Sequence, residues 1–179
     1  MTKILSLLLI ASFVVLTAGA ACSVNVFKKI DPPDVKLFYK RTGLKAKTNN
    51  SSFHFESCGP PEDPPFHFTS IPSIVTSRTK SVNMTLIFRL DADMYDSFFV
   101  SGYVNLFGDK PIPFGDAFDC TSIPVDCPLP LQEKDWVQLS VECLTTVLLP
   151  VTGKIEAKAA ISNYTQTAFC IKGELNIYK

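Results

Sequence analysis

The chain has 179 residues, of which 46% are hydrophobic, and its 17 Lys and Arg residues balance its 17 Asp and Glu residues. The length is that of one ordinary domain, and the composition excludes collagen-like, coiled-coil and disordered chains. A formal net charge of zero provides no basic surface for nucleic-acid phosphates. We therefore expect one globular domain without a nucleic-acid partner.

The N-terminus has the pattern of a secretory signal peptide. Lys3 precedes an apolar run over residues 4–16, and the small residues Ala18, Gly19 and Ala20 follow. An uncleaved membrane anchor is the alternative, because residues 4–21 carry no charge and reach the lower end of spanning length. We expect residues 1–20 to be removed and the mature protein to be secreted.

Sequons and cysteines are typical of the same route. Asn50, Asn83 and Asn163 each begin an Asn-x-Ser/Thr acceptor sequence, which predicts three glycosylation sites. The six cysteines suit an oxidising compartment, but their spacing alone does not select a pairing.

Residues 21–52 form a basic N-terminal segment. Positions 22–52 hold seven Lys or Arg residues and two Asp residues, a net charge of +5. We expect a solvated leader here. Two alternatives are an arm attracted to anionic lipid and, because Val35, Leu37 and Tyr39 alternate, one extra edge strand.

From residue 53 onward the hydrophobic period is two, and no long segment has a helical period. Alternation and β-prone composition predict strands over residues 82–90, 98–107, 136–144, 154–161 and 169–178. Short antiparallel strands joined by turns predict an all-β protein, a two-sheet sandwich of immunoglobulin-like proportions. The immunoglobulin pattern itself is missing, since Trp136 lies too close to Cys127 and Cys143.

Three segments carry a resemblance to a known family. They are residues 51–58, which read SSFHFESC, the pair Cys120 and Cys127 followed by Pro128, and residues 169–172, which read FCIK. Residues 53–179 resemble the ML lipid-recognition domain, with features of its ganglioside-activator and sterol-carrier branches. The resemblance implies disulfides Cys58–Cys170 and Cys120–Cys127. Cys22 and Cys143 then either pair or leave Cys143 as a buried thiol, which we favour.

The resemblance also implies a function without catalysis or a cofactor. Members of the family hold the two sheets apart around an apolar cavity, so we expect a secreted or lysosomal protein that extracts one lipid from a membrane and presents or transfers it. A glycosphingolipid, a sterol or a phospholipid is the expected ligand, with transient membrane contact and a lipid hydrolase or receptor as further partners. The alternatives are a lipid-sensing co-receptor of innate immunity or chemosensation and an adhesion module with a solid core.

Inward-facing rows of the expected strands supply candidates for the cavity wall. They are Leu86, Phe88, Val100, Val104, Ile171 and Leu175, with Ile112, Phe114 and Trp136 nearer the mouth. The same residues would equally fill a solid core. Pro111 and Pro113 flank Ile112, which predicts a stiff loop with an apolar tip, or a plain turn.

Catalytic and metal-binding patterns are weak in this sequence. His54 and His67 lie thirteen positions apart, outside the usual metal-ligand spacing, and no nucleophile motif occurs. Asp91, Asp93 and Asp96 lack the Gly and Glu of a calcium loop, so we expect a solvated turn. We therefore expect neither a catalytic residue nor a metal site.

Overall fold

The computed structural model describes residues 20–31, 51–58, 66–106, 110–122, 125–145 and 152–179. Within these ranges the regular elements are strands. In chain order they are β1 (Ala20–Ile30), β2 (Phe53–Ser57), β3 (Phe66–Ile71), β4 (Val75–Thr76), β5 (Ser81–Arg89), β6 (Ser97–Leu106), β7 (Ile112–Asp119), β8 (Trp136–Thr145), β9 (Gly153–Ser162) and β10 (Thr167–Tyr178). No helix in these ranges is long and apolar enough to cross a membrane.

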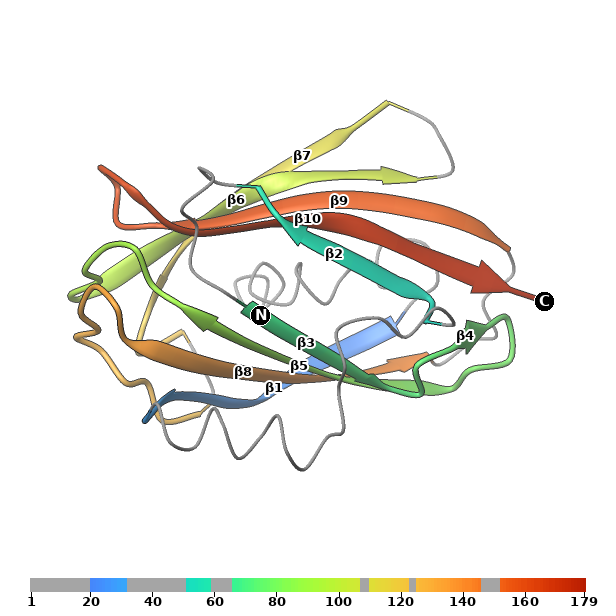
Figure 1. Ribbon diagram of the computed structural model, residues 1–179, viewed down its shortest axis with the longest axis horizontal. Coiled ribbons are helices and arrows are strands. Elements are labelled where there is room, and N and C mark those ends of the chain that lie inside the picture. Colours follow the sequence, from blue (N-terminus) through green and yellow to red (C-terminus); the bar gives the residue numbers. More distant parts are fainter. Residues whose placement is uncertain (1–19, 32–50, 59–65, 107–109, 123–124, 146–151) are drawn as a thin grey trace.

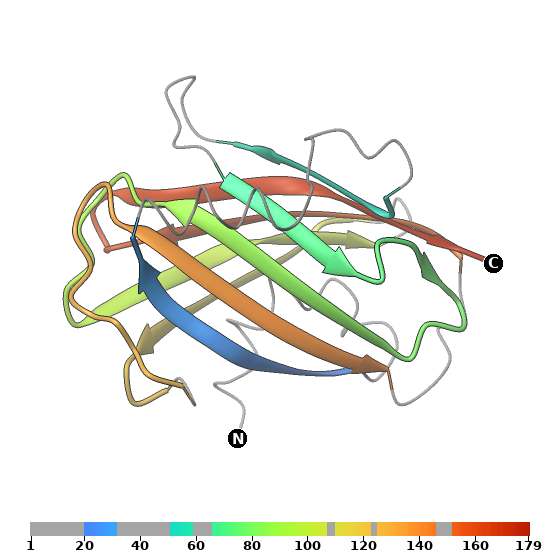
Figure 2. The ribbon, with the colours of Figure 1, turned by 60° about the horizontal axis from the view of Figure 1, so that its bottom comes forward.

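The strands form two sheets that face each other, as Figure 1 shows from the side. Sheet A has the order β1-β8-β5-β3, and Figure 2 displays its four strands side by side. Sheet B has the order β2-β10-β9-β6-β7, and β4 pairs in parallel with the end of β10. The predicted antiparallel β-sandwich is therefore confirmed.

The five strands expected from alternation are confirmed as β5, β6, β8, β9 and β10. Alternation was informative there because one face of each strand meets the core. In β9, for example, Ile155, Ala157, Ala159 and Ile161 are buried, while the residues between them are half-buried.

The proline-rich segment after residue 110 forms part of a strand, so the expectation of a loop was wrong. Ile112–Asp119 is β7, at the end of sheet B, and Pro113 pairs with Tyr103 of β6. An edge strand tolerates proline because only one side of its backbone needs hydrogen-bond donors.

The basic segment also contains a strand that we did not expect at its place. Residues 20–30 form β1 and pair with β8, so the first part of the expected leader belongs to the sandwich. The alternation was hidden because the register shifts between Val24 and Val26, which leaves the buried side chains of Val24 and Phe27 three positions apart. The alternating Val35, Leu37 and Tyr39 lie outside the described residues, as do residues 1–19 of the expected signal peptide and Asn50.

Phenylalanine side chains occupy much of the space between the sheets. Phe88 stacks on Phe169 with ring centroids 4.4 Å apart, and Phe98 stacks on Phe118 at 5.6 Å. All four rings are at most 3% exposed. Full burial of each such ring contributes about 1.5 to 3 kcal/mol to folding.

Two disulfides join segments as the resemblance implied. Cys58–Cys170 links the residue after β2 to β10, and Cys120–Cys127 closes a short loop after β7. Cys143 is fully buried and disulfide-bonded, so the expectation of a free thiol was wrong. Its backbone partner across the β1–β8 ladder is Cys22. A cysteine in an apolar strand can therefore be disulfide-bonded as well as buried.

Candidate functional site

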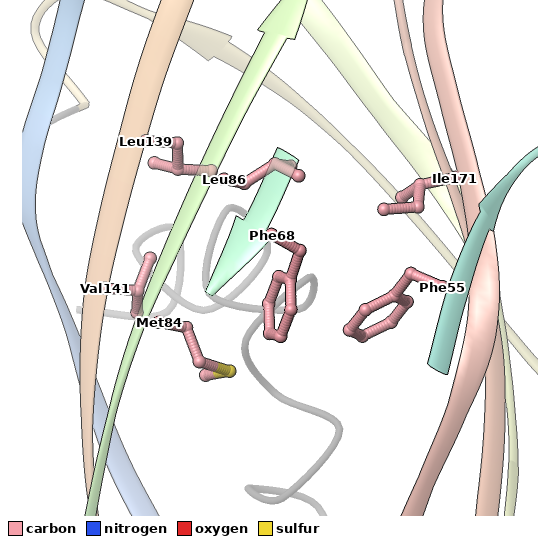
Figure 3. Close-up of a pocket in the computed structure, with 7 residues that line it drawn as sticks. All are labelled: Phe55, Phe68, Met84, Leu86, Leu139, Val141 and Ile171. Carbon is pink, nitrogen blue, oxygen red and sulfur yellow. The ribbon is translucent and has the colours of Figure 1, made fainter. Parts of the chain in front are cut away.

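A pocket lies between the two sheets, near the side where β2 and β3 face each other. Its empty space is about 330 Å³, including the part that opens to solvent. Figure 3 shows its lining, which is apolar throughout: Phe55, Phe68, Met84, Leu86, Leu139, Val141 and Ile171. An apolar pocket of this kind favours the hydrocarbon part of a ligand.

Sheet A supplies the broader wall of the pocket. Met84 lies opposite Val141, and Leu86 lies opposite Leu139, in the β5–β8 ladder. Residues directly opposite in an antiparallel pair point to the same face, so these four side chains form a continuous apolar patch toward sheet B. All four are at most 7% exposed.

The facing wall comes from β10 and β2. Ile171 is buried, whereas Phe55 is half-buried and lies opposite Gly173 in the β2–β10 ladder. A Cβ atom on Gly173 would lie 2.4 Å from Cδ1 of Phe55 and 2.2 Å from the backbone oxygen of His54. The missing side chain at position 173 therefore makes room for β2 and for the Phe55 ring.

Aromatic rings connect the two walls at the mouth of the pocket. Phe68 of β3 meets Phe55 edge-on, with centroids 4.6 Å apart, and meets Phe53 at 5.2 Å. Figure 3 shows the Phe55 and Phe68 rings side by side between the strands. Because β2 and β3 are terminal strands of different sheets, side chains close this side of the sandwich.

The opposite side of the sandwich is filled. Phe27 of β1 contacts Phe98 of β6 at 5.8 Å, and Phe98 stacks on Phe118 of β7. These three rings are at most 4% exposed, whereas Phe55 and Phe68 are half-buried. The pocket thus belongs to the β2–β3 side.

The structure places two of the nine predicted wall residues in the pocket, Leu86 and Ile171. Four others are fully buried parts of the main core, namely Phe88, Val100, Val104 and Leu175. A lipid-lining role for any of them remains a prediction.

The three residues predicted near the mouth lie apart from the pocket lining. Ile112 is 48% exposed at the start of β7. Phe114 is half-buried against the core, opposite Gly102. Trp136 packs with Ile30 and Ile87 in a separate small cluster. Successive side chains of a strand point to opposite faces, so Trp136 lies on the face of β8 opposite to Val137, Leu139 and Val141.

Five pocket residues were missed: Phe55, Phe68, Met84, Leu139 and Val141. Met84, Leu139 and Val141 stand in rows that alternation could have identified, because each belongs to an expected strand. The two phenylalanines belong to the short strands β2 and β3, whose position at the mouth depends on the long-range order of the sheets.

Asp93 of the acidic cluster has structural partners. Asp93 accepts hydrogen bonds from the backbone N–H of Glu133 at 2.7 Å and from the Tyr95 hydroxyl at 2.9 Å. Both bonds lower the pKa of the Asp93 carboxyl, and the bond from Glu133 has the larger effect. This part of the acidic cluster thus joins two turns. Across the described ranges, no group of three His, Cys, Asp or Glu side chains is arranged to hold a metal ion.

The outer face of sheet B carries an ion-pair network. Lys154 lies between Glu156 and Glu174, with Nζ 2.6 Å and 2.9 Å from their carboxylate oxygens. Hydrogen bonds from Lys154 lower the pKa of Glu174. Lys172 pairs with Glu56 at 3.1 Å and connects β10 to β2. All these side chains are substantially exposed, so they form a solvated surface and contribute little to stability.

Two sequons fall within the described residues. Asn83 is exposed on β5, opposite Ile71 and Glu142. The Asn163 side chain donates a hydrogen bond from Nδ2 to the Asp93 carbonyl at 2.7 Å and accepts one from the Gln166 N–H at 2.9 Å. Glycosylation of either residue remains a prediction.

The sequence matches no protein-family model and no curated protein. Among solved structures, the chain is similar to chicken MD-1 complexed with lipid IVa, with 10% identity over 71% of this chain and 90% of that chain and a TM-score of 0.52. MD-1 is an ML-domain protein. The fold is that of an ML-type β-sandwich. This similarity shows the fold alone. It confirms the resemblance to the ML domain as far as the fold is concerned.

Two other solved structures have lower TM-scores. A Niemann-Pick type C2 protein from the Japanese carpenter ant has 18% identity over 70% of this chain and 99% of that chain, with a TM-score of 0.48. The C-terminal domain of wzt has 12% identity over 80% of this chain and 85% of that chain, with a TM-score of 0.39.

Proposed function

We propose that this protein is a secreted or lysosomal carrier that takes one lipid from a membrane into the pocket between its sheets and presents or transfers it, without catalysis. One observation carries the proposal: an ML-type sandwich holds a pocket whose seven lining residues are all apolar. MD-1, whose fold this chain shares, was crystallised as a complex with lipid IVa.

The energetics of lipid transfer explain why such a pocket is useful. Moving a hydrocarbon chain from a bilayer into water costs ~0.8 kcal/mol per CH₂ group. Leucine, methionine, valine and phenylalanine side chains replace the bilayer as the surroundings of the chain, so this cost is largely avoided. A polar headgroup finds no partner in the lining and stays outside, where an enzyme or a receptor can reach it.

The end of β3 offers a surface for membrane contact. Ile71 is 72% exposed and Ile74 is 44% exposed, although both are large hydrophobic residues. Ile71 directly follows Ser70, which lies opposite the pocket residue Met84. The exposed Arg78 and Lys80 follow in the chain and suit an anionic lipid surface. We propose that this end touches the bilayer while a lipid enters or leaves, which requires that Asn83, the cross-strand neighbour of Ile71, carries no glycan.

Lipid analysis of the secreted protein tests the proposal. The protein is purified from culture medium, deglycosylated, and studied by native mass spectrometry before and after incubation with lipid vesicles, at neutral and at acidic pH. Bound lipid is then extracted and identified. One lipid per chain is the expected result, whereas a protein that remains lipid-free under both conditions contradicts a carrier function and favours an adhesion module.

A pair of variants ties binding to the pocket. Met84→Trp fills the pocket from β5, so it should abolish lipid uptake in a folded protein. Ile112→Trp adds the same ring at an exposed position outside the pocket lining and should leave uptake unchanged. Equal uptake by both variants contradicts this pocket as the binding site.

A further inference from the structure

Resting on the secretory route in the proposed function, we infer that Tyr95 is a site of O-sulfation. The reaction class is transfer of a sulfonate group to the phenolic oxygen by a sulfotransferase of the secretory pathway. Tyr95 belongs to the acidic turn, residues 91–96, which connects β5 to β6 and does not line the pocket. The product is a tyrosine sulfate ester, which carries a permanent negative charge.

Carboxylates flank Tyr95 on both sides in the sequence. Asp91 and Asp93 precede it by four and two positions, and Asp96 follows it directly. The nearest basic residue along the chain is Arg89, six positions away. None of the other tyrosines has a carboxylate on both sides within four positions. The sequence context thus distinguishes Tyr95 from the other tyrosines.

Charge complementarity explains why an acidic context suits this class of enzyme. The activated sulfate donor is a mixed anhydride of sulfate and a nucleotide phosphate, so the enzyme surface that holds it must be strongly basic. A basic surface attracts an acidic segment and repels a basic one. The carboxylates of the acidic turn therefore favour the encounter of Tyr95 with such an enzyme.

The transfer step has one co-reactant, the activated sulfate donor. The phenolic oxygen of Tyr95 attacks the sulfur atom, and a new O–S bond forms. The bond between the sulfur and the phosphate oxygen of the donor breaks, and the nucleotide leaves with that electron pair. The phenolic proton goes to a base of the enzyme.

The structure presents the Tyr95 side chain to solvent, where it is 61% exposed. The preceding residue, Met94, is buried and forms a bridge with Leu131, with both N···O distances 2.7 Å. Successive side chains of an extended chain point to opposite sides, so the inward anchoring of Met94 directs Tyr95 outward. An enzyme can therefore reach the phenolic oxygen in the folded protein.

The acidic turn keeps its main supports when the hydroxyl is modified. The Tyr95 hydroxyl donates a hydrogen bond to one carboxylate oxygen of Asp93 at 2.9 Å, and sulfation removes this donor. The other oxygen of Asp93 still accepts the bond from the Glu133 N–H, and the Asp93 carbonyl still accepts the bond from Asn163. The contact that is lost is exposed, so the ring can turn and place the sulfate away from Asp93.

Sulfation of Tyr95 leaves the proposed membrane contact free. The acidic turn lies beyond Arg89, the last residue of β5. Ile71, by contrast, pairs with Asn83 near the beginning of the same strand. The modified tyrosine and the exposed isoleucines thus lie at opposite ends of β5, and the added charge should not alter lipid uptake.

Metabolic labelling tests the inference. The full chain is secreted from animal cells grown with radioactive sulfate, purified from the medium, deglycosylated, and mapped by fragment mass spectrometry. We expect one sulfate ester per chain, on Tyr95, that alkaline phosphatase does not remove. A phosphate ester at Tyr95, or secreted protein without sulfate on Tyr95, overturns the inference.

Matched variants separate sequence context from exposure. Tyr95→Phe should remove the label. Tyr164→Phe should keep it, because Tyr164 is 67% exposed on a neighbouring turn but has no charged residue within four positions. Asp96→Asn should lower the label on the order of tenfold, whereas Asp126→Asn, at an exposed carboxylate outside the acidic turn, should not. Full labelling of Tyr95→Phe, or equal labelling of the two Asp variants, counts against the assignment.

Lipid uptake by the same samples separates this inference from the carrier function. Tyr95→Phe should bind lipid as the unaltered protein does. Sulfated protein that takes up no lipid contradicts the carrier and supports the modification, whereas lipid-binding protein without sulfate has the opposite meaning. A chain that stays inside the cell without glycans contradicts the secretory route, and with it both proposals.

Discussion

The Phe55 ring and the α-carbon of Gly173 share a space that admits no further atom. The residues are cross-strand partners, and a Cβ on Gly173 would meet both the ring and the backbone of β2. A glycine without a positive φ is thus required here by close approach, and it sets the position of one wall of the pocket.

Gly173→Ala should destabilise the fold and displace β2. The added methyl group would lie 2.2 Å from a backbone oxygen, so the strand itself must shift, and such overpacking typically costs about 1 to 3 kcal/mol. Chemical denaturation measures the free energy of unfolding. Gly115→Ala is the control, because its nearest neighbour would be the tip of the Phe99 ring at 3.0 Å, which can rotate away. A smaller loss for Gly173→Ala than for Gly115→Ala contradicts the packing argument.

Removing the two described disulfides should have unequal effects. Cys58–Cys170 closes a sequence separation of 112, and Cys120–Cys127 one of 7. In the chain-entropy model, the paired serine substitutions should lower the free energy of unfolding by about 4 to 5 kcal/mol for the long loop and about 2.5 kcal/mol for the short one. Loss of secretion should follow the same order. Equal yields of both variants, with equal denaturation midpoints, argue against this ranking.

Ser52→Ala should cost about 1 to 3 kcal/mol, because it leaves a buried donor unpaired. The Ser52 hydroxyl is fully buried and accepts a hydrogen bond from the Val75 N–H at 2.7 Å. That bond helps to anchor β4 near the end of β10. Ser23→Ala serves as the control, since the Ser23 hydroxyl is exposed and bonds the Asn25 side chain. Thermal unfolding of both variants should show a loss for Ser52→Ala only.

The stability of the protein should fall on mild acidification, in part through His67. Burial lowers the pKa of His67 below its usual 6.5, so the folded state binds a proton less readily than the unfolded state. This contribution is complete above pH 6.5 and is lost as pH falls from there toward the lowered pKa. His67→Gln should flatten the dependence of unfolding free energy on pH in this window. The exposed His54, replaced in the same way, is the comparison, and an unchanged slope in the His67 variant refutes the assignment.

How much of the fold the sequence predicts depends on how each strand meets the core. Alternation of hydrophobic residues predicts strands with one buried face, such as β5 and β9. β1 is not predicted, because a bulge at Val24 and Val26 breaks the period. β7 is not predicted either. Proline usually indicates a turn, but an edge strand can also contain it, as β7 contains Pro113.

The candidate site was harder to predict than the fold, because a pocket is a property of two sheets together. Leu86 and Val104 are both buried inward residues, yet Leu86 lines the pocket and Val104 lies in the filled core. Their own strands look alike in sequence. What separates them is which side chains the neighbouring strand and the opposite sheet bring to each place. Phe68 comes from β3, beside Leu86 in the same sheet, and Ile171 comes from β10 of the other sheet.

Pro113 has a consequence for the behaviour of the protein in solution. β7 ends sheet B, so one side of its backbone has no strand beside it, and a second molecule could pair there. Proline offers no N–H near the start of β7 for such a contact. Pairing of two molecules along the free side of β7, a route to fibres, is thereby disfavoured.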